Sequence, residues 1–257
     1  MNASSPPPAL VWLRRDLRLD DHPALTAAAA AGPVIPVFIL DPQTEALGAA
    51  HLFRLERSLE RLAAAFRARN ARLILRRGEA LATLRALIEE TGARAVHWSR
   101  LHDRAARERD TAVKAGLKED GVEATSHPGH LLFEPWTVET GSGGFYKVYT
   151  PYWKSVSERV VHEPLEAPSL RLPEAWPQSL ELSELGLSRR MNRGAEVVGR
   201  FVEAGEEAAR AKLETFLEAR VRVYPAERDR PDLRATSGMS DHLALGEISP
   251  RRIWSEC

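Results

Sequence analysis

Short apolar runs that alternate with helical segments constrain the fold of this chain more strongly than any other feature. Each run has the length of a buried strand and is bounded by turn-forming or charged residues. The predicted strands are residues 9–13, 34–40, 72–75, 95–98 and 122–127. Pro36 removes one hydrogen-bond donor from the second of these strands, which weakens the prediction there.

Helices are predicted between the strands. Pro23 opens an alanine-rich helix, which Gly32 and Pro33 end. The next helix is indicated by apolar residues that recur at steps of three and four and so share one face. They are Leu52, Leu55, Leu59, Leu62 and Phe66. Two more helices are predicted at residues 80–91 and 104–119.

This alternation predicts an α/β fold, a Rossmann-like parallel five-stranded sheet with helices on both faces. The crossovers should be right-handed, and a ligand should bind beyond the carboxyl ends of the strands. No Gly-x-Gly-x-x-Gly follows the first strand, and no Gly-x-x-x-x-Gly-Lys-Ser/Thr occurs. A standard dinucleotide-binding domain or P-loop NTPase domain is therefore not supported.

Composition narrows the class of protein. The 36 basic and 36 acidic residues cancel, so bulk charge does not predict a nucleic-acid partner, although a local basic face remains possible. The single cysteine, Cys257, excludes an intramolecular disulfide and fits a reducing compartment. Residues 1–8 lack the basic start and apolar core of a secretory signal, and no apolar run approaches a membrane span. The simplest expectation is a cytoplasmic protein without a membrane partner.

The pattern changes after the fifth strand. Prolines punctuate residues 129–187, which show no sustained periodicity and are expected to form a connector over the surface. An aromatic cluster near its start is expected to be a packing anchor, and its members are Tyr146, Tyr149, Tyr152 and Trp153. Residues 194–222 are predicted to be helical again, with one apolar side.

The last part of the chain has clear helix boundaries. Ser240 is predicted to cap a short helix that Gly246 ends. Ser249 and Pro250 then start another helix. Small residues lead into the first of these helices, and free backbone N–H groups there could hold a phosphate. An ordinary pair of capped helices explains the same local pattern.

Several segments together resemble one family, the DNA photolyases and cryptochromes. The run Trp-Leu-Arg-Arg-Asp-Leu-Arg-Leu-Asp-Asp, which begins at Trp12, is similar to the opening of the class I photolyases. Residues 131–135 and 145–153 resemble the connector of the family, and residues 236–251 resemble the start of its flavin-binding domain. The resemblance therefore extends, in order, over nearly the whole chain.

The resemblance implies light-dependent DNA repair by a deoxyribodipyrimidine photolyase, a carbon–carbon lyase that splits cyclobutane pyrimidine dimers in UV-damaged DNA. In this family, photoexcited reduced FAD donates the electron, while the protein supplies position and electrostatics. The damaged bases must leave the helix stack to reach the flavin. The implied domains are an antenna domain at residues 1–130, a connector at 131–190 and the beginning of an all-helical FAD-binding domain at 191–257. A monomer is expected.

Carried over by position, six residues match family positions that contact the FAD phosphates and ribityl chain. They are Tyr224, Thr236, Ser237, Gly238, Met239 and Ser240. Gly238 departs from the family pattern, in which a large and often basic residue is usual, so its contact would be through the N–H alone. Asp241 replaces the usual proline and places negative charge near the phosphates.

Two further residues have both a functional and a structural interpretation. Arg228 matches a basic position at the edge of the DNA-facing cleft, and it could equally be a surface arginine paired with Glu227 or Asp229. Asp103 lies nearest to the acidic residue that holds the pterin in folate-binding relatives, but it could simply cap the helix that follows. The antenna chromophore could be methenyltetrahydrofolate, 8-hydroxy-5-deazaflavin or FMN, and the sequence does not choose among them.

Most flavin contacts of the family, its electron-transfer tryptophans and its dimer pocket would lie beyond residue 257. We therefore expect no catalytic residue and no metal site within this chain, which resembles the N-terminal part of a longer enzyme and should be inactive by itself. Two alternatives remain open at this stage. One is a cryptochrome-type blue-light photoreceptor, and the other is a free-standing chromophore-binding α/β module.

Overall fold

The computed structural model describes residues 6–257. Residues 1–8 are not expected to form a secretory signal. The first five residues of this segment lie outside the described part of the chain. A parallel sheet forms the centre of the molecule, with strand order β3-β2-β1-β4-β5. Its strands are β1 (Ala9–Leu13), β2 (Val34–Leu40), β3 (Ile74–Arg77), β4 (Ala95–Ser99) and β5 (Glu123–His127). The predicted five-stranded parallel sheet is thus confirmed.

The predicted third strand is shifted in the structure. The prediction placed it at residues 72–75, whereas β3 begins at Ile74 and continues through two arginines. Arg76 and Arg77 pair with Ile39 and Leu40, because an edge strand with one open side accommodates charged side chains. Pro36 is tolerated because β2 pairs with β3 only from Val37 onward.

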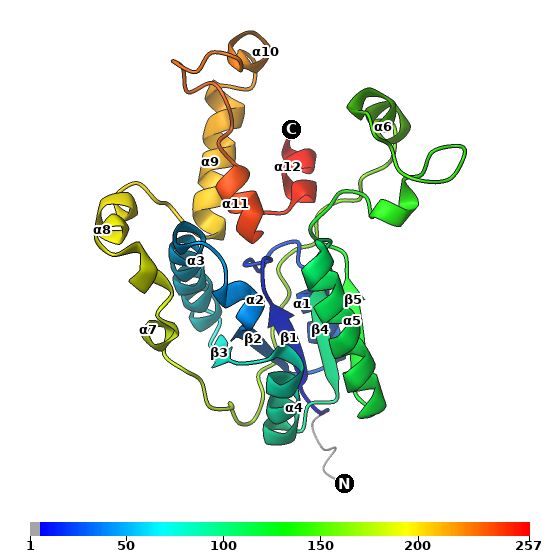
Figure 1. Cartoon of the computed structure of the whole chain (residues 1–257), viewed down its shortest axis with the longest axis vertical. Coiled ribbons are helices and arrows are strands. Elements are labelled where there is room, and N and C mark those ends of the chain that lie inside the picture. The colour runs from blue at the N-terminus through cyan, green and yellow to red at the C-terminus, as the bar shows by residue number, and fades with distance from the viewer. Residues whose placement is uncertain (1–5) are drawn as a thin grey trace.

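Helices cover both faces of the sheet (Figure 1). On one face, α1 (Pro23–Ala31) and α3 (Ala49–Arg67) bury their apolar sides against Val11 and Leu13 of β1. On the other, α4 (Ala80–Thr91) and α5 (Arg104–Glu119) pack against the alternate residues of β1. Those alternate residues are Leu10 and Trp12, as the period of two in a strand requires.

The remaining elements follow the sheet in sequence. A short helix, α2 (Pro42–Glu45), follows β2. Beyond β5 lie η1 (Pro135–Thr137), α6 (Tyr149–Val156), α7 (Leu182–Leu185), η2 (Leu187–Met191), α8 (Arg193–Gly199), α9 (Glu206–Ala219), α10 (Tyr224–Glu227), α11 (Ser240–Leu245) and α12 (Pro250–Glu256). The helices α9, α11 and α12 lie beyond the carboxyl end of β1 (Figure 1).

The prediction of one helix over residues 194–222 is wrong. The chain leaves helical geometry after Gly199 and returns to it at Glu206. Gly205 has a φ of 96°, a value that favours glycine, and its N–H donates to the buried carboxylate of Glu247 at 2.6 Å. A contact with a distant residue therefore outweighs the local helical pattern.

The aromatic cluster of the connector does not act as a core anchor. Its rings contact one another, and the ring of Trp153 also meets that of Trp254 from α12, with centroids 6.1 Å apart. Tyr149 nevertheless stays 69% exposed. Among the helices of residues 6–257, none combines the length and the apolar character needed to cross a membrane.

Candidate functional site

The loop that follows β1 is the polar centre of the structure. We call residues 14–22 the signature loop. Although seven of its nine residues carry ionisable side chains, all but Arg15 are buried. Burial of so many charged groups is costly unless each is paired, so their partners define what the loop does.

Arg18 connects three parts of the chain. Its guanidinium donates to the carbonyl oxygens of Asp20 and Asp21 within the loop, to that of Gly129 at the start of the connector and to that of Gly246 after α11. The side chain is 1% exposed. A guanidinium has five donors in a fixed plane, which suits a cluster of carbonyl oxygens better than an ammonium would.

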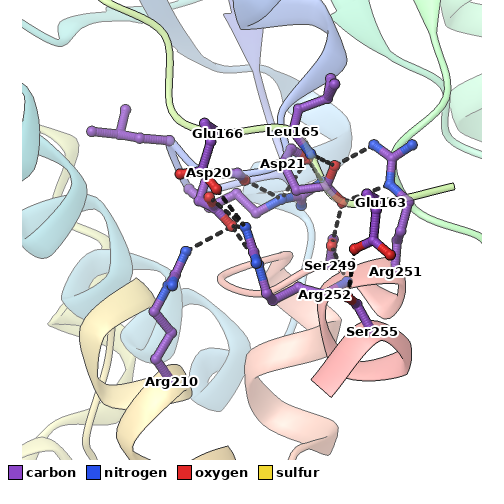
Figure 2. Close-up of polar contacts among 12 residues, drawn as sticks. Asp20, Asp21, Glu163, Leu165, Glu166, Arg210, Ser249, Arg251, Arg252 and Ser255 are labelled. Atoms are coloured by element: carbon purple, nitrogen blue, oxygen red, sulfur yellow. Dashed lines mark hydrogen bonds and ion pairs between the residues drawn. The ribbon is translucent and has the colours of Figure 1, made fainter. Parts of the chain in front are cut away.

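Two neighbouring aspartates hold the helices that follow (Figure 2). Asp21 accepts from the hydroxyl of Ser249 and the guanidinium of Arg251, and also from the backbone N–H of Leu165 at 3.0 Å. Asp20 accepts from Arg252, with both nitrogen–oxygen distances at 2.9 Å. We call this group of contacts the aspartate clasp.

The clasp gains further contacts from α9. The Asp20 carboxylate also lies 2.7 Å from Arg210 (Figure 2), and Glu206 accepts the backbone N–H of Leu19 at 2.8 Å. Ser249 meanwhile caps α12 by accepting the N–H of Arg252, which confirms the predicted cap. The signature loop therefore fixes α9 and α12 against the end of β1.

The segment 236–240 is the predicted phosphate-binding loop. Within residues 6–257, the backbone N–H groups of Thr236, Ser237 and Gly238 have no acceptor, and Thr236 and Gly238 are exposed. Gly238 has a φ of 61°. Met239, by contrast, is buried among residues of α9, so it is a packing residue that fixes the loop.

The prediction that Ser240 caps α11 is wrong. The helix begins at Ser240 itself, and the cap position falls on Met239, which provides no side-chain acceptor. The Ser240 hydroxyl is therefore left exposed beside the loop. The predicted end at Gly246 is confirmed, with a φ of 64°.

Lys212 is a basic residue of α9 that lies beside this loop, and it was not predicted from the sequence. It projects from α9 over Gly238, where a Cβ atom would lie 3.1 Å from Cε and 3.5 Å from Nζ of the lysine. Its ammonium is 3.5 Å from the Asp241 carboxylate, which Arg54 approaches at 3.6 Å. Lys212 offsets the negative charge that Asp241 brings, so the loop is compatible with a phosphate group.

A buried group lies directly behind the loop. The carboxylate of Glu247 binds Arg54 at 2.6 Å and His242 at 2.6 Å. Burial opposes ionisation of Glu247, but the hydrogen bonds from His242 and Arg54 outweigh it and lower the pKa of the carboxyl to about 2. No local sequence pattern indicated this pair, because Arg54 lies on α3, far away along the chain.

Tyr224 begins α10 and Arg228 directly follows this helix, away from the sheet. The ring of Tyr224 meets that of Phe216 at a centroid distance of 5.8 Å, in an edge-to-face geometry. Arg228 is exposed; its Nε lies 3.7 Å from Asp229, and its guanidinium lies over the Tyr224 ring at 6.0 Å. The pairing of Arg228 with Asp229 that the structural interpretation predicts is therefore present. The role of Arg228 toward DNA stays a prediction.

Asp103 lies at the wall of a hollow beyond the carboxyl ends of the strands. The hollow has a volume of about 280 Å³ and sits where the strand order reverses between β1 and β4. Asp103 caps α5, as the structural interpretation predicted, by accepting the N–H of Ala106, and it also pairs with Arg15. His51 and Leu245 line the same hollow. Burial and then the charge of Arg15 lower the pKa of His51.

A smaller hollow of about 170 Å³ lies nearby, between β4, β5 and α5. Trp136 is 58% exposed at its rim, with the guanidinium of Arg100 lying 5.3 Å from the ring centroid. Arg107 and Lys114 contribute positive charge to the lining. Sequence reasoning did not single out this place.

The comparisons with known proteins agree with this architecture. The family model described as DNA photolyase matches residues 9–169. The chain is 41% identical to a deoxyribodipyrimidine photo-lyase from Agrobacterium fabrum, covering 96% of this chain and 52% of the relative. It is 32% identical to cryptochrome-2 of Arabidopsis thaliana, over 95% of this chain and 42% of the relative.

A solved structure gives the same result. A bacterial class III photolyase from Agrobacterium tumefaciens superposes with a TM-score of 0.94 at 39% identity, covering 100% of this chain and 54% of the other. The chain therefore spans about half the length of the relatives it matches. On the family model, these relatives and the shared fold, the chain belongs to the DNA photolyase/cryptochrome family.

Proposed function

We propose that this chain is part of a light-driven DNA repair enzyme that splits cyclobutane pyrimidine dimers. The observation that carries the proposal is the 41% identity to a deoxyribodipyrimidine photo-lyase over 96% of the chain. The fold is compatible with it, because the aspartate clasp holds the C-terminal helices as one body with the α/β domain. In this view residues 1–130 form the antenna domain, 131–190 the connector and 191–257 part of a flavin-binding domain.

FAD would lie against the loop 236–240. The N–H groups of Ser237 and Gly238 and the hydroxyl of Thr236 would donate to its phosphates, and Lys212 would add positive charge. Tyr224, Met239 and Ser240 complete the set inferred from the family positions. When bound, FAD supplies the light-driven electron that opens the cyclobutane ring. The residues of this chain position the cofactor and neutralise its charge.

An antenna chromophore would occupy the hollow at the strand-order reversal. Ligands of open α/β sheets bind at such places, and Asp103, Arg15 and His51 provide polar groups there. Asp103 already caps α5 and pairs with one nitrogen of Arg15, so the remaining N–H donors of Arg15 are the groups available to the chromophore. Methenyltetrahydrofolate, 8-hydroxy-5-deazaflavin and FMN are the three groups to test.

A cryptochrome-type photoreceptor is the second candidate, because the chain is 32% identical to cryptochrome-2 of Arabidopsis. Both candidates predict a flavin, so only repair separates them. The test is survival after ultraviolet irradiation of a photolyase-deficient bacterial strain that expresses the full-length protein. Recovery in blue light but not in darkness supports repair. Equal survival in light and darkness, with flavin present in the purified protein, would point to the photoreceptor.

A further inference from the structure

The place of Lys212 is determined by how α9 packs against the loop 236–240. Met239 of this loop is buried in one apolar cluster with Leu213 of α9. Lys212 directly precedes Leu213 on the helix, and Gly238 directly precedes Met239 in the loop. The buried contact therefore brings the side chain of Lys212 next to the backbone of Gly238.

Gly238 leaves the space that the lysine occupies. A Cβ at this position would lie 3.1 Å from Cε and 3.5 Å from Nζ of Lys212, so a larger residue would displace the ammonium group. The φ of Gly238 is 61°, which also favours glycine. The absence of a side chain thus allows an ammonium group to lie directly beside the backbone of the loop.

Asp241 attracts the same ammonium group. Its carboxylate lies 3.5 Å from Nζ of Lys212, which is longer than the roughly 2.7–2.9 Å of a charge-assisted hydrogen bond. An exposed ion pair of this kind adds little to stability. Its effect is on the position of the charge, and an ammonium has three N–H donors with which it can bind a ligand as well.

We propose that Lys212 binds a phosphate of FAD together with the backbone N–H of Gly238, and that the affinity of the loop for FAD depends on this lysine. A lysine beside a loop of backbone N–H groups is a recurrent phosphate-binding combination. Arg54 is a poorer candidate, because Glu247 already binds its guanidinium at 2.6 Å. The choice of FAD rests on the proposed function, whereas the placement of Lys212 beside Gly238 does not.

The experiment measures the dissociation constant of FAD from the full-length protein. Flavin is removed, and FAD is titrated back while its fluorescence is followed. Lys212→Met removes the charge and keeps an unbranched side chain, whereas Lys212→Arg keeps the charge. Lys118→Met is the matched control, because it removes the same charge at an exposed position of α5.

K212M should raise the Kd for FAD about tenfold to hundredfold, the factor that corresponds to one hydrogen bond to a charged group. K212R should restore most of the affinity, and K118M should leave it unchanged. The difference between wild type and K212M should narrow as salt is added, because ions screen an exposed charge. The phosphorus NMR resonances of bound FAD should shift in K212M and not in K118M.

Asp241 provides a second test. In the K212M background, Asp241→Asn should recover part of the affinity, because the carboxylate then lies near the phosphates without its lysine. In the wild-type background the same change should not tighten binding, since Lys212 already offsets the carboxylate. An equal gain in both backgrounds would show that the two residues act independently and would contradict the proposal.

Three further results would overturn the proposal. They are a K212M variant with the wild-type Kd, a K212R variant that loses as much affinity as K212M, and phosphorus resonances that stay unchanged while affinity falls. Circular dichroism checks folding, and Lys212→Gln is a second variant if K212M unfolds.

Failure of the proposed function gives a different result. In that case FAD binding would still depend on Lys212, while the full-length protein would leave pyrimidine dimers intact under light. Conversely, light-dependent repair by a protein whose K212M variant binds FAD normally would refute the role of Lys212 alone.

Discussion

Arg18 donates a hydrogen bond of 2.9 Å to the carbonyl oxygen of Gly246, although 228 positions separate the two residues in the chain. The same loop binds α9 and α12 through the aspartate clasp. The arginine–aspartate motif that resembles the family's opening thus has a physical role in this structure. It joins the α/β domain to α9 and α12, the helices that precede and follow the segment containing the loop 236–240.

Gly246 is expected to tolerate no side chain. Its φ is 64°, and a Cβ there would lie 2.0 Å from the carbonyl oxygen of Arg15. Gly246→Ala should lower the free energy of unfolding by about 2–4 kcal/mol, since left-handed backbone strain and overpacking add. Gly121→Ala is the control, because Gly121 has a φ of 73° with nothing within 4 Å of a Cβ. Equal losses in urea titrations of the two variants would show that the Arg15 contact does not matter.

Arg18 is expected to resist even a conservative change. A lysine in its place keeps the charge but cannot reach all four carbonyl oxygens that the guanidinium binds. Arg18→Lys should therefore cost about 2–4 kcal/mol, because each buried acceptor left unpaired costs about 1–3 kcal/mol. Arg104→Lys, at a side chain that is 92% exposed, should cost less than about 0.5 kcal/mol. A loss at Arg18 no larger than at Arg104 would refute the assigned role.

A substitution of Asp21 tests how much the aspartate clasp stabilises the fold. Its φ is 46°, a conformation that asparagine also accepts, so Asp21→Asn removes the charge without backbone strain. The change should cost about 2–3 kcal/mol, because hydrogen bonds to charged groups are the stronger ones. It should also speed amide hydrogen exchange in α12, whose cap Ser249 binds Asp21. Asp229→Asn, at an 88% exposed side chain, is the control. Unchanged exchange in α12 would mean that other contacts hold this helix.

Acid should destabilise the fold, beginning with the histidines. Burial lowers the pKa of His127 to about 4, with the neighbouring His97 adding to the effect, and burial lowers that of His130 to about 3. The unfolded chain binds these protons from a pH of about 6.5 downward, whereas the folded state does not. Stability should therefore fall as the pH drops below about 6.5, by up to about 1.4 kcal/mol per pH unit for each histidine.

At lower pH, protonation of carboxylates further reduces the stability of the fold. Glu247, with a pKa of about 2, contributes stability that is present above its unfolded value and is lost as the pH falls toward the folded one. The measurement is a series of urea titrations between about pH 7 and about pH 4, the range in which the histidines of the unfolded chain take up protons. His127→Gln should flatten the curve in its upper part. An unaltered pH dependence in that variant would contradict the role given to His127.

Much of the fold could be predicted because the signals that determine it are local. Strand length, apolar character and helix periodicity gave the sheet and the boundaries of α4 and α5. The misplaced third strand shows the limit, since Arg76 and Arg77 carry no apolar signal and belong to β3 only through their pairing with β2. The break before α9 likewise depends on the bond between Gly205 and Glu247.

The site could be predicted only in part, because several of its contacts join residues that lie far apart in the chain. The loop 236–240 was singled out from its sequence, and its role toward FAD stays a prediction. One of the two interpretations of Asp103, that of a helix cap, is confirmed. Lys212 could not be found, because nothing in the sequence places an α9 side chain over Gly238. The signature loop would have been taken for a solvated loop without the family resemblance, as its partners lie up to 232 positions away.

Dimer splitting in vitro tests the proposed repair activity directly. Full-length protein with reduced flavin is mixed with a short DNA strand containing one thymine dimer, and the restored thymines are quantified by chromatography after blue light or darkness. Restored thymines are expected in the illuminated sample alone, with turnover beyond one dimer per protein. A protein that binds flavin but leaves the dimer intact under light would contradict it.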